Sequence, residues 1–215
     1  GLPPEWEKHL SQQFGLPPDK VETIKLPEYE ARIPTVLQQM KDYLFENGGL
    51  VVGIFRIAPD QDECTYVKQL LNENKFSSCS DVNCMSNLIK VWFRELPSHI
   101  LNPIRTNIDN VDDEPKALGV VELLPQPNRS LMQWLLDMCV MIGTVQLRLS
   151  LNLCPVRNAA VNKMTPKNLA IVISPNLFTP DTGDPLKALQ FSQRVARFVE
   201  LAIQGASSSN STPRL

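Results

Sequence analysis

Apolar residues recur at helical spacing through most of the chain, and proline, glycine and capping residues separate the runs. The spacing predicts helices beginning at or near Pro34, Asp60, Asp81, Asn128, Thr165-Pro166 and Asp184-Pro185. Asp60 with Glu63 resembles a capping box, and Gly48-Gly49 ends the first helix. No alternating hairpin pair is visible, so the pattern predicts an all-α fold, one helical bundle.

The two ends of the chain differ from this helical middle. Residues 1–31 are rich in proline and predict an irregular arm with a short helix from Glu5 to about Gln13. Residues 205–215 are mostly small and polar, and such a composition predicts a disordered tail. The helical domain is therefore expected to cover residues 32–204.

Composition excludes several classes of function. With 21 Lys and Arg against 23 Asp and Glu, the net charge of −2 argues against a dedicated nucleic-acid binder. No apolar run reaches the roughly 20 residues that span a bilayer, and no secretory signal is visible. The five cysteines are odd in number, with no C-x-x-C pair, which favours reduced intracellular thiols over disulfides. Two distant histidines offer little for a metal site, so no metal is expected.

The most informative loop runs from Leu50 to Arg56, between two predicted helices. Ile54 and Phe55 would anchor it to the core, and Gly53 allows close approach of the backbone. Arg56 would then project from a fixed base. Taken alone, such an arginine is more often the partner of an internal salt bridge.

Further polar residues stand out on two later helices. Lys90 and Arg94 are four residues apart, on the side opposite the apolar positions of their helix. This is usually a solvated face, but like charges at this spacing slightly destabilise a helix, which indicates an acidic partner. Asn168 lies in the first turn of the helix that Thr165 begins, and Asn176 follows its end; neither is remarkable alone.

Taken together, these stretches resemble the RhoGAP domain family, the activators of Rho-class GTPases. The resemblance covers about residues 32–204, in the family's order and spacing. The strings that carry it are G-I-F-R at 53–56, K-V-W-F-R-E-L-P at 90–97, N-K-M at 162–164, N-L-A at 168–170 and S-P-N-L at 174–177. The strings at 33–40, 48–50 and 184–189 are most similar to GAPs that carry a CRIB (Cdc42/Rac-binding) motif, such as the Rop GAPs of plants. Residues 1–6 resemble the segment after such a motif.

The resemblance implies a GTPase-activating protein for a GTP-bound Rho-family GTPase of the Rac, Cdc42 or Rop type. Arg56 would be the arginine finger inserted in trans, with Gly53 and Phe55 shaping its loop. Lys90 would contact the GTPase or this loop, and Arg94 would brace the loop.

The same resemblance implies roles for the other polar residues. Asn176 would meet the GTPase switch surface, Asn168 would be structural or at the interface edge, and Glu95 would pair with an arginine inside the domain. GTP and Mg²⁺ would be held by the partner, so the chain would need no cofactor of its own. It would be an enzyme activator in the cytoplasm, recruited to the plasma membrane through its GTPase.

Two departures from the family pattern keep an alternative open. Val52 stands where the family usually has an acidic residue, and the lead-in from Gly48-Gly49 is one residue short. These changes suggest a catalytically weak or inactive RhoGAP-like module that binds GTPases or other signalling partners. A helical adaptor that uses Trp6 and the proline-rich arm is a third hypothesis. A stand-alone hydrolase is disfavoured, because no nucleophile–base pair or P-loop is visible.

Residues 148–160 fit the family's usual helix poorly.

Overall fold

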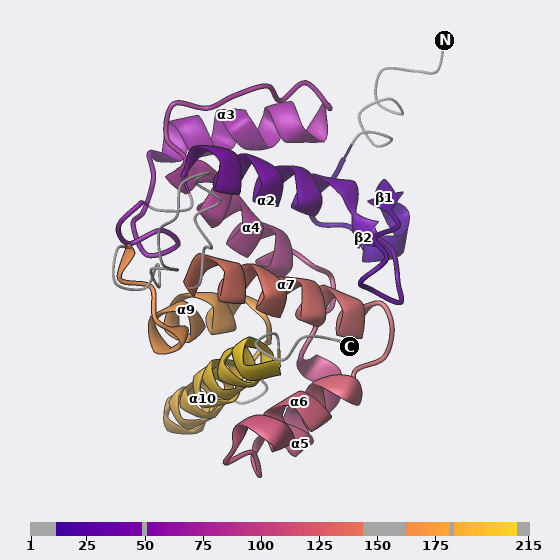
Figure 1. The fold of residues 1–215 in the computed structure, drawn as a ribbon, viewed down its shortest axis with the longest axis vertical. Helices are drawn as coiled ribbons and strands as arrows, with labels where there is room; N and C mark the ends of the chain where they lie inside the picture. Colours follow the sequence, from indigo (N-terminus) through magenta and orange to yellow (C-terminus); the bar gives the residue numbers. More distant parts are fainter. Residues whose placement is uncertain (1–11, 49–50, 144–161, 181–182, 210–215) are drawn as a thin grey trace, which may run out of the picture.

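The computed structural model describes residues 12–48, 51–143, 162–180 and 183–209. Within them the fold is a bundle of α-helices with little strand, as predicted (Figure 1). The α-helices are α2 (Thr35–Asn47), α3 (Gln61–Asn72), α4 (Asn83–Arg94), α5 (Arg105–Ile108), α6 (Glu114–Glu122), α7 (Asn128–Gly143), α9 (Pro166–Ile173) and α10 (Pro185–Ser209). Short 3-10 turns occupy η1 (Pro18–Lys20), η2 (Asn102–Ile104) and η3 (Ser174–Asn176).

Helix α4 lies at the centre of one half of the bundle and packs against α2, α3 and η3. Nine of its twelve residues are buried. The sequence predicted one buried face with Lys90 and Arg94 opposite it. The two cations do lie on the accessible side, but neighbours cover more of the helix than the predicted face. What remains accessible is a stripe of Asn87, Lys90 and Arg94, of which only Arg94 is fully exposed. The other half of the bundle forms where α10 packs against α6, α7 and α9 (Figure 1).

The predicted helix starts are largely confirmed, with two differences in detail. Asp60 accepts a hydrogen bond from the Glu63 amide and caps α3. The Glu63 carboxylate does not complete a capping box: it accepts hydrogen bonds from the amide and hydroxyl of Ser80 instead. Asn128 lies inside the first turn of α7 rather than before it, and its amide donates to the Ile100 carbonyl oxygen.

The described part of the N-terminal arm is packed onto the helices. Phe14 is buried, and the Trp92 indole of α4 donates a hydrogen bond to the Gln13 carbonyl oxygen at 2.9 Å. Strands β1 (Thr23–Ile24) and β2 (Ile33–Pro34) pair antiparallel, so the expectation of no hairpin pair is wrong. Two residues per strand are too few for an alternating pattern to be seen in the sequence. Gln12 and Gln13 are not helical, and the rest of the predicted first helix lies outside the described residues.

The C-terminal end also departs from its prediction. Residues 205–209, expected to be disordered, continue helix α10 to Ser209. Gly205 allows this helix to approach α6 closely, since a Cβ there would lie 3.0 Å from the Leu118 side chain. The hydroxyl of Ser208 donates to the Gln204 carbonyl oxygen and supports the last turn. Residues 210–215 and the segment 148–160 lie outside the described residues, and the domain boundary at residue 32 stays a prediction.

The remaining exclusions from sequence concern thiols and membranes. Cys64, Cys79, Cys84 and Cys139 are free thiols, and Cys139 is buried in α7 as expected; Cys154 lies outside the described residues. Among the described helices, none combines the length and apolar character needed to cross a membrane.

Candidate functional site

The loop that carries Arg56 lies at one edge of the bundle, beside the segment leading into α9 (Figure 1). Ile54 and Phe55 have no exposed surface, whereas Arg56 is exposed. The loop is therefore anchored by two apolar side chains immediately before the guanidinium, as the sequence predicted.

Gly53 organises the backbone of this loop. Its φ of +75° lies in the left-handed region, where only glycine is unstrained. Its amide donates to the Asn162 carbonyl oxygen at 2.8 Å, and its own carbonyl oxygen accepts from the amides of Arg56 (2.8 Å) and Ile57 (3.0 Å). One glycine peptide thus joins the base of the loop to a distant segment and to Arg56.

The backbone of Phe55 is the second part of the loop that is fixed by a hydrogen bond. Its φ of +71° is unusual for a bulky residue and costs about 1–2 kcal/mol. The ammonium of Lys90 donates a hydrogen bond to the Phe55 carbonyl oxygen at 2.7 Å. Strained backbone of this kind persists only where the surrounding structure holds it in place, and it is frequent at functional sites. The strain is here next to the exposed Arg56.

The two cations of α4 have different environments. Lys90 is half-buried, and this burial, with a smaller contribution from the nearby Arg94 charge, lowers its pKa below the usual value. Arg94 is exposed and forms no hydrogen bond or ion pair with the described part of the chain. Lys90 thus makes the contact with the loop that was one of its two expected roles, whereas the expected bracing of the loop by Arg94 is not seen among the described residues.

Glu95 was expected to pair with an arginine, and this expectation is wrong. Its carboxylate binds the ammonium of Lys68 on α3, at 2.6 and 2.7 Å. The same ammonium lies 5.1 Å from the centre of the Phe14 ring. Packing of the arm and α3 against α4 brings this lysine to Glu95. The helical periodicity of α4 alone cannot predict this ion pair, because the partner lies on another helix.

The two asparagines around α9 both point toward the protein's own backbone. The amide of Asn168 donates to the Lys163 carbonyl oxygen at 2.8 Å, and its backbone N–H donates to the hydroxyl of Thr165. Asn176 is buried, and its amide donates to the carbonyl oxygens of Val172 and Ile173, both at 3.1 Å. In this structure Asn176 therefore stabilises the end of α9 rather than presenting its amide to solvent.

Asn162 is the residue at this site that the sequence did not single out. In the sequence it was noted only as the first residue of the N-K-M string, yet its backbone carbonyl oxygen accepts the hydrogen bond from the Gly53 N–H. Only its place in that string, three residues before the Thr165-Pro166 helix start, could have marked it, because the turn at Lys163, with a φ of +61°, is visible only in the structure.

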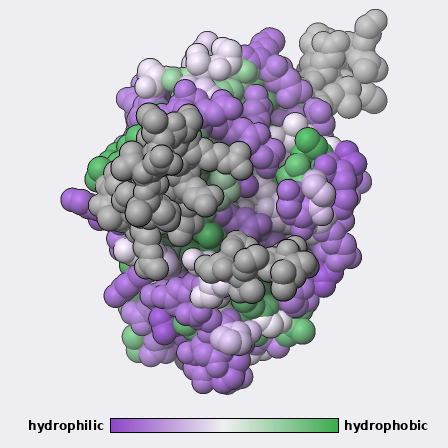
Figure 2. Space-filling view, viewed as in Figure 1, coloured by the Kyte–Doolittle hydropathy of each residue, from purple (hydrophilic) through white to green (hydrophobic). Residues whose placement is uncertain are grey.

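Exposed cationic and apolar side chains lie on the loop of Arg56 and on helix α9, whose preceding segment bonds to that loop. Val52 and Ile57 flank it, with 50% and 46% of their surface exposed. Beyond Asn162, exposed Lys167 and Ile171 are four residues apart on α9 and share one helix face. The face of the molecule in Figure 2 is mostly hydrophilic, with hydrophobic groups in small separate patches. An exposed guanidinium on a rigid loop suits insertion into an anionic site of another protein.

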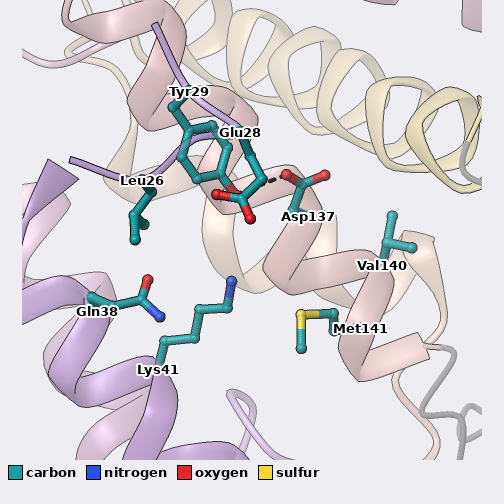
Figure 3. A pocket seen from close by; sticks show the side chains of 8 residues that line it. All are labelled: Leu26, Glu28, Tyr29, Gln38, Lys41, Asp137, Val140 and Met141. Atoms are coloured by element: carbon teal, nitrogen blue, oxygen red, sulfur yellow. Dashed lines mark hydrogen bonds between the residues drawn. The ribbon is translucent and has the colours of Figure 1, made fainter. Parts of the chain in front are cut away.

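A separate pocket of about 520 Å³ lies between the arm, α2 and α7 (Figure 3). There Tyr29 donates a hydrogen bond to Asp137 at 2.8 Å, and burial raises the pKa of Tyr29. Lys41 points into the pocket, and its ammonium lies 5.5 Å from the centre of the Trp134 ring. None of the candidate residues from the sequence lines this pocket, so it is distinct from the site around Arg56.

Comparisons with known proteins show which family this chain is similar to. Residues 34–182 match the model of the RhoGAP domain. The chain is 37% identical to Rho GTPase-activating protein gacA of Dictyostelium discoideum over 188 residues, covering 86% of the chain and 51% of that protein. It is 32% identical to Rho GTPase-activating protein 4 of Arabidopsis thaliana over 216 residues, covering 94% of the chain and 45% of that protein.

The chain thus spans about half the length of these curated relatives. Among solved structures, human Rho GTPase activating protein 15 has a similar fold, with a TM-score of 0.70 at 19% identity. The match covers 91% of this chain and 90% of that one.

Proposed function

Because the chain belongs to the RhoGAP domain family, we propose that it is a GTPase-activating protein for a GTP-bound Rho-family small GTPase. We place its partner in the Rac, Cdc42 or Rop class, following the sequence resemblance to CRIB-type GAPs. The single observation that carries the proposal is the exposed Arg56 on a loop whose backbone is held on both sides of its apolar anchors.

Arg56 would act as an arginine finger in the partner's active site. Negative charge spreads over the phosphoryl group in the transition state of GTP hydrolysis, and an arginine supplied in trans accelerates such reactions by about 10³–10⁵. This corresponds to roughly 4–7 kcal/mol of transition-state stabilisation. A loop that is already ordered pays little to place the guanidinium, so more of the binding energy lowers the barrier.

The domain would contribute no cofactor of its own. GTP, Mg²⁺ and the attacking water belong to the partner GTPase in this proposal, and the chain completes that active site rather than forming a separate hydrolase. We therefore describe the protein as an enzyme activator. Its expected location is the cytoplasm, with recruitment to the plasma membrane through the GTPase.

The surface around the finger supports a protein partner. Arg94 and Lys167 supply positive charge, while Val52, Ile57 and Ile171 supply exposed apolar area. Such a mixture is typical of the interfaces of transient complexes, in which charge steers the encounter and apolar contacts slow dissociation. We assign these residues to contact with the GTPase.

The test is single-turnover GTP hydrolysis on a panel of Rac-, Cdc42-, Rho- and Rop-type GTPases. We expect the wild-type chain to accelerate at least one of them by about 10³-fold or more, and Arg56→Ala to remove nearly all of this effect while binding persists. Arg197→Ala is the matched control, since Arg197 is an exposed arginine of α10 whose ion pair is with Glu200. It should leave the rate unchanged.

Two outcomes would contradict the proposal. Failure to accelerate any Rho-family GTPase, with tight binding to the GTP-bound form, would favour the alternative of a docking module. Acceleration that survives in Arg56→Ala would mean that another group supplies the transition-state charge.

A further inference from the structure

We propose that Asn162 is a positioning residue for the arginine finger, holding the loop of Arg56 through the amide of Gly53. This inference rests on the proposed function, because it assigns how that function's finger is held in place. Asn162 does not touch the reacting groups in this proposal; it acts through the backbone of the loop.

Asn162 has no exposed surface, and three of its polar groups make three different contacts. Its carbonyl oxygen accepts the Gly53 N–H at 2.8 Å. Its side-chain amide donates to the Ile142 carbonyl oxygen at 2.9 Å, and its side-chain oxygen accepts the Met164 N–H at 2.9 Å. The loop at Gly53 and the helix at Ile142, both distant in sequence, therefore meet at one asparagine.

The two side-chain contacts explain why an asparagine is needed. Ile142 lies near the end of the described part of α7, and the Asn162 side-chain amide donates a hydrogen bond to its carbonyl oxygen. The bond to Met164 closes the turn at Lys163, which has a left-handed backbone. The side chain thus bonds Asn162 to α7 through Ile142 and to the following turn through Met164, and we infer that these two bonds set the direction of the peptide carbonyl that faces Gly53.

The contact continues from Gly53 to Arg56. The Gly53 carbonyl oxygen accepts the amides of Arg56 and Ile57, so a rotation of the Gly53 peptide would move the base of the finger. Lys90 holds only the other side, at Phe55. A displacement of about 1 Å in a catalytic group costs on the order of 10²-fold in rate. Loss of the Asn162 side chain should therefore reduce the maximal rate while leaving most of the GTPase contact surface intact.

The competing explanation is that Asn162 only stabilises the fold. Ser130 provides a matched control, since it is equally buried and its hydroxyl accepts the Ala31 N–H at 2.9 Å. Ser130 lies at the opposite end of α7 from Ile142 and so has no path to the finger loop through these bonds. Both Asn162→Ala and Ser130→Ala should lower stability, but only the first should alter the finger.

The kinetic test uses the full chain and a responsive GTPase under single-turnover conditions. In Asn162→Ala we expect the rate at saturating activator to fall about tenfold or more, with less than about a threefold change in the half-saturating concentration. Ser130→Ala should keep its maximal rate. Combining Asn162→Ala with Arg56→Ala should cause no further loss, because a residue that acts only through Arg56 has nothing left to position.

A second readout does not depend on activity. The Gly53 amide should exchange slowly with solvent in the wild type, and about tenfold or more faster in Asn162→Ala, with no change in Ser130→Ala. If the alanine variant does not fold, Asn162→Asp keeps the oxygen that binds Met164, removes the donor to Ile142, and should show the same acceleration of exchange at Gly53.

The outcomes separate this inference from the proposed function. If the wild type accelerates no GTPase, the proposed function fails, and exchange at Gly53 still decides whether Asn162 holds the loop. Exchange at Gly53 as fast as in an open loop in the wild type would overturn the inference. An unchanged maximal rate in folded Asn162→Ala, or an equal loss in Ser130→Ala, would also overturn it.

Discussion

At the scale of single residues, the loop around Arg56 is held by bonds to its backbone and not by the arginine itself. Gly53 and Phe55 both have positive φ angles. The Gly53 N–H donates a hydrogen bond to the Asn162 carbonyl oxygen, and the Phe55 carbonyl oxygen accepts one from Lys90. The guanidinium is left exposed. This division of roles allows the loop to be rigid while its charged end stays available to a partner.

Lys90 makes this arrangement sensitive to pH. Burial, followed by the charge of Arg94, lowers the pKa of Lys90, so its ammonium is lost at a lower pH than that of an ordinary lysine. We expect GTPase acceleration to decline on the alkaline side, below the usual lysine pKa of about 10.4, as the charged donor to Phe55 disappears. Rates measured from neutral to alkaline pH, divided by the intrinsic rate of the GTPase at each pH, test this.

The effect of the same group on stability has the opposite sign. Because the folded-state pKa of Lys90 is lower than the unfolded one, the unfolded chain binds more protons between the two values, and this group's contribution to stability rises with pH in that window. A decline in activity caused by unfolding would therefore not come from Lys90. Lys90→Arg keeps its charge, so an alkaline decline of equal size in that variant would contradict the assignment.

At the scale of elements, α9 begins with a cap that also orders the turn behind Asn162. Thr165 accepts the Asn168 N–H with its hydroxyl, and the Asn168 amide in turn holds the Lys163 carbonyl oxygen. The start of α9 and the turn at Lys163 are thus one hydrogen-bonded unit, and Asn162 at the beginning of this turn bonds to the loop of Arg56. Local sequence signals are strong here, because every partner lies within a few residues.

We expect Thr165→Ala to lower the free energy of unfolding by about 1 kcal/mol, the usual cost of losing an N-cap. For a chain of this size that is a fall of roughly 2–4 °C in Tm. Thr65→Ala is the control, since Thr65 lies within α3 and its hydroxyl only bonds back to the Gln61 carbonyl oxygen. Thermal unfolding of both variants checks the prediction, and equal losses would show that the hydroxyl of Thr165 has no capping role.

At the scale of the whole molecule, the N-terminal arm joins the two helices that flank the candidate site. Phe14 is buried against the bundle. The backbone carbonyl oxygen of Gln13 accepts a hydrogen bond from the Trp92 indole of α4, and the backbone N–H of Gln13 donates to the side chain of Asn72 at the end of α3. The arm is therefore part of the support of α4, which carries Lys90 and Arg94.

This contact predicts a large effect of a mutation far from the finger. Phe14→Ala should lower the free energy of unfolding by about 3–5 kcal/mol, as for other fully buried aromatic residues. Tyr66→Ala, at a side chain that is 60% exposed, should change it by no more than about 0.5 kcal/mol. Chemical denaturation measures both. A loss below about 1 kcal/mol in Phe14→Ala would show that the arm is not integral to the fold.

The sequence by itself determined the helical class, most helix starts and the anchored loop of Arg56. These features depend on neighbours within one or two turns, so spacing and capping residues carry the information. The order of the motifs likewise identified the family, which the comparisons confirmed. The residue roles that follow from that resemblance stay predictions until the mutants are measured.

Only the tertiary structure decided which partner each polar side chain takes. Glu95 meets Lys68, Asn176 turns inward onto α9, and Asn162 reaches both α7 and Gly53. The same holds for α4, which is buried on most sides because α2, α3 and η3 surround it. Contacts between segments far apart in the chain are set by how the helices pack, and no local pattern of polar and apolar residues encodes that packing directly.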